Sequence, residues 1–282
     1  MKTKHLRLMQ RAYVILFFCF MYLPIAYMIV FSFNQSKGYA LFTGFTLKWY
    51  TSLIHNSAIL SALRVSLEVA LISAVIATVL GTAASLGIAS MSRKSRLVIT
   101  NITYIPVVNP EIITGISLML LFVAYQRFAE GVSWLPDTIM GMPTLLIAHI
   151  AFNVPYVIFN VTPKLKQLDI KLYEAALDLG CDPRQAFFKV ILPEIGPAIL
   201  SAFLICLTYS IDDFMISYFN CGTVETLPIA IYSMTRKKVS PEIYALSTIM
   251  FVVILTIILI SNAMESREYR RDQKALRGED VK

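Results

Sequence analysis

Charged residues are scarce in this sequence, and their scarcity excludes an ordinary soluble domain. Asp, Glu, Lys and Arg make up 15% of the 282 residues, whereas soluble globular proteins have about 25%. Hydrophobic residues make up 57% of the chain. This composition predicts an integral membrane protein.

The sequence also lacks the motifs of cofactor sites. Its four cysteines have no CxxC or other metal-ligand spacing, and its three histidines are scattered, so we expect no metal site and no cofactor. It has no GxxxxGK(S/T) loop for phosphate, so any use of ATP requires another chain. The net charge of +7 would suggest nucleic acid in a soluble protein. Here the basic residues have a topological explanation, and we expect no nucleic-acid partner.

Six apolar segments are long enough to cross a bilayer core of about 30 Å. The sequence therefore predicts an all-α fold with six transmembrane helices and one long polar insert. Residues 1–11 precede the membrane domain of residues 12–264, and residues 265–282 form a tail. The predicted helices cover residues 12–33, 66–89, 101–124, 141–161, 195–219 and 243–264, and the polar insert covers residues 162–194.

Basic residues set the predicted orientation. Four lie in residues 1–11, three between the second and third segments, five in the polar insert and six in the tail. Because cytoplasmic loops are enriched in Lys and Arg, both termini and the insert are expected to be cytoplasmic. The run Arg236–Lys238 in the last outer loop departs from this trend. A receptor-docking surface and a plain solvated run both remain open for it.

The polar insert contains a pattern for two short helices joined by a corner, within Leu172–Pro193. Glu174–Ala176 favour a first helix, and Gly180 can end it in the left-handed conformation that glycine adopts without steric cost. Asp182 is expected to cap the second helix, with a proline directly after it. Pro193 is expected to break this second helix before the fifth apolar segment.

The third apolar segment is interrupted by Pro106 and by Asn109-Pro110-Glu111. Asn109 is expected to cap a new helix that Pro110 begins. A discontinuous helix at membrane depth is tolerated only where its backbone is buried in protein or faces water. Glu111 is then a charge inside the spanning region, which is costly and usually functional. A purely structural role at the helix start, or in an ion pair, is the alternative.

The fifth segment places two adjacent carboxylates, Asp212 and Asp213, in an apolar run, with Tyr209 within one turn of both. Adjacent helical residues point about 100° apart, so at most one carboxylate can face a given path. Together with Glu111 they would line a cavity that favours a cation. Protonation of one carboxylate, or structural pairing with Arg64 or a partner subunit, remains an alternative.

Two other segments have faces that are expected to pack inside the bundle. Small residues in the second segment, including Gly81 and Gly87, would let helices approach closely. At its outer end Arg64 and Glu68 stand one turn apart and can form an ion pair. The fourth segment has a polar stripe for which hydrogen bonds between helices are a sufficient explanation, formed by His149, Asn153, Tyr156 and Asn160.

The spacing of residues in the polar insert is specific. Glu-Ala-Ala, three residues, Gly180, nine residues, Val190, one residue and Leu-Pro resemble the EAA loop of ABC-importer permeases, with Val190 where Ile is more usual. In that family the loop docks into a cleft of the cytoplasmic ATPase. The resemblance implies a type I ABC-importer permease fold with a cytoplasmic coupling loop at residues 162–194. The residues it implies for ATPase coupling are Tyr173, Glu174, Ala175, Ala176, Gly180, Leu192 and Pro193.

The resemblance extends over nearly the whole chain. The segments FSFNQSK, LKWY, NPEIITGISL, LTYSIDDF, TLPIAIYS and VSPEIYALST are similar to those of the PotC-like family of spermidine/putrescine permeases. From its position alone, Trp49 is most simply an aromatic anchor at the membrane interface. In the family, Glu111 stands where Asp is more usual. The resemblance implies a substrate pathway that includes Trp49, Glu111, Ser210, Asp212 and Asp213, and Tyr209 joins this set because it lies beside both aspartates.

Residues and resemblance together predict a permease subunit, not an enzyme, of an ATP-driven importer in the bacterial inner membrane. The resemblance implies four partners besides the lipid bilayer: a second homologous permease in a heterodimer, a cytoplasmic ABC ATPase dimer, a periplasmic polyamine-binding protein and the polyamine itself.

The sequence does not separate spermidine from putrescine or another amine. Two alternatives stay open: a permease of the same fold for another solute, and a stand-alone transporter in which the three acids relay protons. Independence from ATP and from other subunits would identify the latter.

Overall fold

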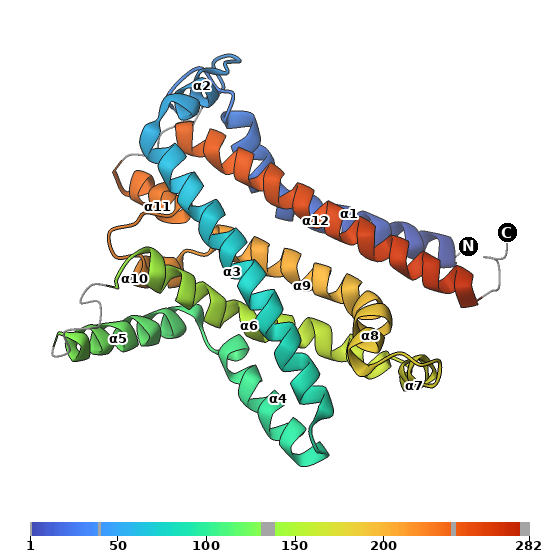
Figure 1. Ribbon diagram of the computed structural model, residues 1–282. Helices are drawn as coiled ribbons and strands as arrows, with labels where there is room; N and C mark the ends of the chain where they lie inside the picture. The colour runs from blue at the N-terminus through green and yellow to red at the C-terminus, as the bar shows by residue number, and fades with distance from the viewer. Residues whose placement is uncertain (1, 39–40, 131–138, 238–240, 277–282) are drawn as a thin grey trace. The chain divides into compact units, whose positions relative to one another are not determined.

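The structure, a computed structural model, describes residues 2–38, 41–130, 139–237 and 241–276. These residues are almost entirely helical, with one isolated bridge between Asn34 and Phe45 (Figure 1). The last residues of the predicted tail, 277–282, and Lys238 of the basic run Arg236–Lys238 lie outside the described residues. The helices are α1 (Lys2–Phe31), α2 (Lys48–His55), α3 (Ser57–Ser90), α4 (Arg93–Val108), α5 (Glu111–Ala129), α6 (Met142–Gln167), α7 (Ile170–Asp178), α8 (Pro183–Ala186), the π-helical turn η1 (Phe187–Ile191), α9 (Leu192–Asp212), α10 (Met215–Asn220), α11 (Leu227–Lys237) and α12 (Pro241–Leu276).

Six stretches within the described residues are long and apolar enough to cross a membrane, which confirms the predicted fold class. Their bounds differ from the predicted ones where the chain breaks. The third predicted span, 101–124, runs across the end of α4, so the apolar stretch that can span is Glu111–Ala129. The candidate spans are Met9–Phe31, Ser57–Ser90, Glu111–Ala129, Met142–Gln167, Pro183–Asp212 and Pro241–Ile260.

The fifth predicted span, 195–219, is also wrong as a single helix. It stops at Asp212, the backbone becomes extended at Asp213, and a separate short helix, α10, follows. Helix α6 continues to Gln167, so the first residues of the predicted polar insert are helical. The two breaks, at residues 109–110 and 213–214, are central to the site described below.

The chain divides into two compact units, Met1–Leu60 with Ile231–Leu255, and Ser61–Ala230 with Thr256–Lys282. In the second unit, α3, α6 and α9 share a core. Ala74 of α3, Val157 of α6 and Cys206 of α9 are all fully buried in one cluster. A second cluster joins α5, α6 and α10. Thus α6 lies between the two groups of helices and contributes to both cores (Figure 1).

The approach of α3 to α6 depends on a glycine. A Cβ atom at Gly81 would lie 2.5 Å from Cβ of Val157 and 3.1 Å from the carbonyl oxygen of Val154. At Gly87, two turns further along α3, a Cβ atom would meet nothing within 4 Å. The small-residue face is therefore a close-packing surface at Gly81 and not at Gly87. The predicted ion pair in the first turns of α3 is confirmed, with Nε of Arg64 2.7 Å from Oε1 of Glu68.

In the first unit, the segments FSFNQSK and LKWY meet around Asn34. The indole Nε1 of Trp49 donates to the carbonyl oxygen of Asn34 at 2.7 Å, and the Asn34 side chain binds the backbone at Gly38, Leu41 and Thr43. Trp49 is 5% exposed. Instead of lying free as an interface anchor, this side chain holds the loop between α1 and α2.

Candidate functional site

An acidic pocket of about 380 Å³ forms in the second unit, where three helix ends meet one face of α6. Glu111 is the first residue of α5, Asp212 is the last residue of α9, and Asp213 lies between α9 and α10. The structure thus brings together Glu111, Tyr209, Asp212 and Asp213. The pocket is lined by Glu111, Phe152, Tyr156, Tyr209, Asp212, Asp213, Phe214 and Met215.

The break before Glu111 is present as predicted, but its capping differs. Asn109 is the C-cap of α4 and not the N-cap of the next helix, and its Nδ2 donates to Oγ1 of Thr114 at 3.2 Å. Pro110 precedes α5 in the N-cap position. Glu111 then occupies the first turn of α5, where the helix dipole favours a negative charge.

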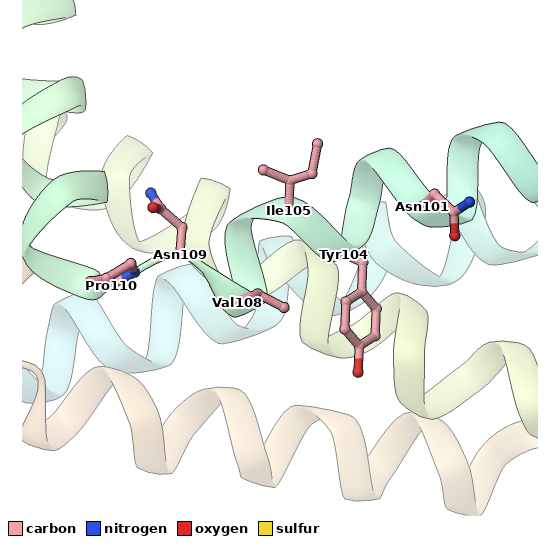
Figure 2. Close-up of a pocket in the computed structure, with 6 residues that line it drawn as sticks. All are labelled: Asn101, Tyr104, Ile105, Val108, Asn109 and Pro110. Atoms are coloured by element: carbon pink, nitrogen blue, oxygen red, sulfur yellow. The ribbon is translucent and has the colours of Figure 1, made fainter.

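A second pocket, of about 490 Å³, lies along α4 beside the same break. Figure 2 shows that its residues come from α4 and from the Asn109-Pro110 corner. Tyr104 leaves α4 on one side and packs edge-on against Phe159 of α6, with ring centroids 4.9 Å apart. None of the six described residues that line this pocket is charged. Its lining is therefore uncharged, in contrast to that of the acidic pocket.

The two adjacent aspartates have different surroundings. Asp212 is exposed, whereas the side chain of Asp213 is only 2% exposed. Asp213 accepts hydrogen bonds from the backbone N–H of Ile216 at 3.3 Å and of Ser217 at 2.7 Å. The expectation that only one carboxylate can face a given path is consistent with this arrangement, in which Asp212 is the accessible one.

Three aromatic rings form one wall of the acidic pocket. Tyr156 and Tyr209 pack edge to face with centroids 4.9 Å apart, and the Phe152 ring lies 5.2 Å from that of Tyr156. Phe152 and Tyr156 stand four residues apart on α6 and therefore face the same way. Neither residue is predicted from the sequence to lie at this site. Their common helical face was a signal, but nothing in the sequence indicated that this face meets the end of α9.

Beneath the pocket, the polar stripe of α6 hydrogen-bonds to the elements around it. Nδ2 of Asn153 donates to Oγ of Ser210 at 2.8 Å, and Nε2 of His149 lies 3.0 Å from Oγ of Ser217. The predicted bonds between helices are thus confirmed for these two residues. Nδ2 of Asn160 donates to the carbonyl of Tyr156 in its own helix, at 3.0 Å.

Two of the predicted pathway residues are not at the pocket lining. Ser210 is 4% exposed, and its Oγ lies 3.3 Å from Oγ of Ser73 and accepts from Asn153. Its contacts join α3, α6 and α9 under the pocket. Trp49 belongs to the first compact unit, where it is buried against Asn34.

The predicted coupling loop has the expected helix–corner–helix form. Helix α7 ends at Asp178, and Gly180 follows with φ +87°. The N–H of Cys181 bonds to the carbonyl of Ala176 and that of Gly180 to the carbonyl of Leu177, which is a Schellman motif. Asp182 caps α8, because its Oδ1 accepts from the N–H of Gln185 at 2.7 Å.

The prediction that Pro193 breaks the helix before the fifth apolar segment is wrong. Helical structure runs without interruption from α8 through the π-helical turn η1 into α9. Proline lacks an N–H group and normally disturbs an α-helix. Here the wider turn accommodates it, with the N–H of Leu192 bonded to the carbonyl of Phe187, five residues earlier. The coupling loop is therefore connected to α9 by continuous helix.

Exposed side chains cover much of the coupling loop within the described chain. Glu174 and Ala175 are exposed and Ala176 is buried. Three large apolar side chains, Leu172, Leu179 and Phe188, are also exposed, and Leu179 is 87% exposed. Exposed large apolar side chains in an otherwise polar segment are typical of an interaction site. Across all the residues that the structure describes, no three His, Cys, Asp or Glu side chains are placed to hold a metal ion.

The fold and these two sites define a multi-pass membrane permease. Residues 73–271 match the family of binding-protein-dependent transport system inner membrane components. The structure is similar to that of a bacterial ABC transporter involved in the import of the acidic polysaccharide alginate, with a TM-score of 0.71 over 94% of this chain and 96% of that one. At 19% identity this likeness concerns the fold alone.

The chain belongs to this family and is a permease of an ABC importer, a transport subunit rather than an enzyme. It is 36% identical to the putrescine transport system permease protein PotI of Escherichia coli (strain K12), over 94% of this chain and 95% of that protein. It is 34% identical to the spermidine/putrescine transport system permease protein PotC of the same strain, over 90% of this chain and 93% of that protein. A binding-protein-dependent system of this kind includes an ATPase and a binding protein as partners of the permease.

Proposed function

We propose that this permease carries polyamines across the bacterial inner membrane, and that the acidic pocket is part of their path. The observation that supports this most directly is the lining of the pocket. Glu111, Asp212 and Asp213 supply three carboxyl groups, and no Lys or Arg is among the eight described lining residues. Such a pocket favours a cation and disfavours an anion.

The chemistry of polyamines fits both the acidic and the aromatic side chains of the lining. These molecules are flexible polycations whose ammonium groups are separated by methylene segments. Carboxylates balance the charges, and aromatic faces attract partly desolvated ammonium groups by about 0.5–2 kcal/mol each. Tyr156 and Tyr209 supply such faces directly beside Asp212. A pocket with few contacts of this strength can also release its cargo, which transport requires.

The relatives support the choice of substrate. Those whose names specify putrescine or spermidine/putrescine transport match nearly the whole chain, at 30–36% identity. The fold alone would not identify the solute, because an importer of an acidic polysaccharide shares it. The negative lining of the pocket is the local feature that separates a polyamine from such an anion.

The proposed mechanism places both termini and the coupling loop in the cytoplasm, on the basis of the basic residues described above. ATP closes the ATPase dimer, which pushes on α7 and α8. This push turns the permease pair outward to accept polyamine from a periplasmic polyamine-binding protein, and hydrolysis reopens the inward side. Support for a mechanical connection comes from the continuous helix that joins α8 to α9, since α9 ends at Asp212. We further propose that the partner is a second, homologous permease in a heterodimer.

The test is uptake by the complete complex. The tagged chain, with the subunits that co-purify in mild detergent, is reconstituted in liposomes, and uptake of labelled spermidine and putrescine is measured with the binding protein outside and ATP inside. We expect uptake that needs both. A large excess of unlabelled polyamine should compete, whereas an anionic oligosaccharide at the same concentration should not.

Two results would contradict the proposal. ATP-dependent uptake of another solute but of no polyamine would keep the permease class and overturn the substrate. Uptake by the chain alone, driven by a proton gradient without ATP, would overturn the coupling role of α7 and α8 and make the three acids a proton relay. Omitting ATP with an imposed pH gradient is therefore the essential control.

A further inference from the structure

Asp213 has the contacts of a structural cap. Its side chain is almost fully buried, and its two carboxylate oxygens accept from the backbone N–H groups of Ile216 and Ser217. These N–H groups belong to the first turn of α10, where they have no partner within the helix. A carboxylate in this position satisfies them and stabilises the start of the helix.

His149 joins the same cluster from α6. Its Nε2 lies 3.0 Å from Oγ of Ser217 and 3.6 Å from Oδ2 of Asp213. Its Nδ1 has no hydrogen-bond partner within the described part of the chain. A neutral imidazole has one N–H. If this N–H is on Nε2, it faces both acceptors, and only an unprotonated nitrogen is left without a partner.

The start of α10 is in turn packed against α5. A Cβ atom at Gly115 would lie 3.1 Å from the carbonyl oxygen of Met215, so the two helices touch through their backbones. Nδ2 of Asn220, at the end of α10, donates to the carbonyl of Gly115 at 3.2 Å. Gly115 is one turn after Glu111. A shift of α10 would therefore move the turn that presents Glu111 to the pocket.

From this geometry we infer a division of labour between the two aspartates. Asp213 and His149 are positioning residues that hold α10 against α6 and, through α10, set the position of Glu111. Asp212 and Glu111 are the carboxylates that meet the ammonium groups of the substrate. This inference rests on the proposed function for its second part only, since the capping of α10 does not depend on the identity of the substrate.

The experiment uses the assembled complex and compares matched variants. Asp213→Ala removes the cap, and Asp213→Asn removes the charge but keeps one side-chain oxygen as an acceptor. We expect Asp213→Ala to lower the melting temperature by roughly 2–6 °C, and Asp213→Asn to recover most of this loss. Asp212→Ala should leave the melting temperature unchanged. His149→Ala combined with Asp213→Ala should lower it by less than the two separate losses together, because the residues form one cluster.

Transport kinetics give the second readout. Asp212→Asn should raise KM for spermidine about tenfold or more, as expected for a lost contact between charged groups. Asp213→Ala should instead lower Vmax, with KM changed less than about threefold, because it acts through the position of α10, and Asp213→Asn, which keeps an acceptor for the cap, should stay closer to the wild type in both quantities. The tenfold and threefold limits separate a substrate contact from a positioning effect.

The outcomes distinguish this inference from the proposed function. If the wild-type complex takes up no polyamine, the proposed function fails, and the melting temperatures still decide whether Asp213 caps α10. If Asp213→Ala melts with the wild type, the positioning role is overturned. Equal rises in KM for Asp212→Asn and Asp213→Asn would also overturn it, because both carboxylates would then contact the substrate.

Discussion

The coupling loop and the acidic pocket lie in the same compact unit but are built in opposite ways. The loop is local, since each hydrogen bond of its turn at Gly180 and its cap at Asp182 joins residues at most five positions apart. The pocket joins Glu111 to residues from Phe152 to Met215, on four different helices. A local motif can be recognised from its spacing alone. A pocket made by distant segments requires the packing that brings them together.

This comparison leads to different expectations for substitutions. Changes in the loop should alter the use of ATP while the affinity for substrate stays the same. Changes in the pocket should alter the affinity while ATPase docking stays the same. Glycines in the helical core and in the loop should also differ, since Gly81 is constrained by the neighbouring helix α6 and Gly180 by its own backbone angle.

The largest effect is expected for Glu174→Arg in the coupling loop. Glu174 is exposed on α7 and has no role in the core, so the variant should fold and assemble. Reversing a charge at an interface typically costs several kcal/mol, so ATP-driven uptake should fall by roughly tenfold or more. Uptake and substrate-stimulated ATPase activity in liposomes check this.

Glu130→Arg reverses another exposed acidic residue, at the end of α5, and is the matched control. Full uptake by Glu174→Arg would remove this residue from the coupling surface.

The second effect concerns packing and uses two glycines of α3. Gly81→Ala places a Cβ atom 2.5 Å from Cβ of Val157, so the helices must separate, and the free energy of unfolding should fall by about 1–3 kcal/mol. Gly87→Ala meets no atom within 4 Å and gains helix propensity, so the stability should rise by up to about 1 kcal/mol. Thermal unfolding in detergent measures both. Equal changes at the two positions would show that α3 does not approach α6 closely.

The third effect tests the aromatic wall. Tyr209→Leu removes the ring beside the carboxylates, and the loss of about 0.5–2 kcal/mol should raise KM for spermidine roughly two- to thirtyfold. Tyr209→Phe keeps the ring face and should retain most of the affinity. ATP hydrolysis without substrate should be the same in both variants. If the phenylalanine variant is as impaired as the leucine variant, the hydroxyl group and not the ring is important.

The smallest effect is expected at Gly180. Its φ of +87° is unfavourable for other residues, and no atom lies within 4 Å of a Cβ there, so backbone strain is the only cost. Gly180→Ala should destabilise the corner by about 1 kcal/mol, and Gly180→Asn by less, because Asn tolerates this conformation better. Hydrogen exchange of residues 170–186 is the measurement. Protection that is unchanged in Gly180→Ala would mean that the corner does not need the left-handed conformation.

Much of the fold could be predicted from particular residues. Long apolar segments predicted six membrane helices, and Asn109-Pro110 predicted the break before α5, because proline and its preceding residue disfavour a continuous helix. The second break was missed. The run Ser210–Tyr218 contains no proline or glycine, and α9 nonetheless ends at Asp212. Asp213 satisfies the first N–H groups of α10, and this contact is visible only once the helices are in place.

The sequence by itself determined the class of the protein and the form of its coupling loop, because hydrophobicity, turn residues and caps act over a few neighbouring positions. It also indicated that Glu111, Asp212 and Asp213 are unusual in apolar segments. Only the tertiary structure decided how they differ. Asp213 is buried against the start of α10, whereas Asp212 remains accessible beside Tyr156 and Tyr209. Packing of α6 against α9 and α10 makes this difference, since burial and hydrogen bonding depend on neighbours that are distant in the chain.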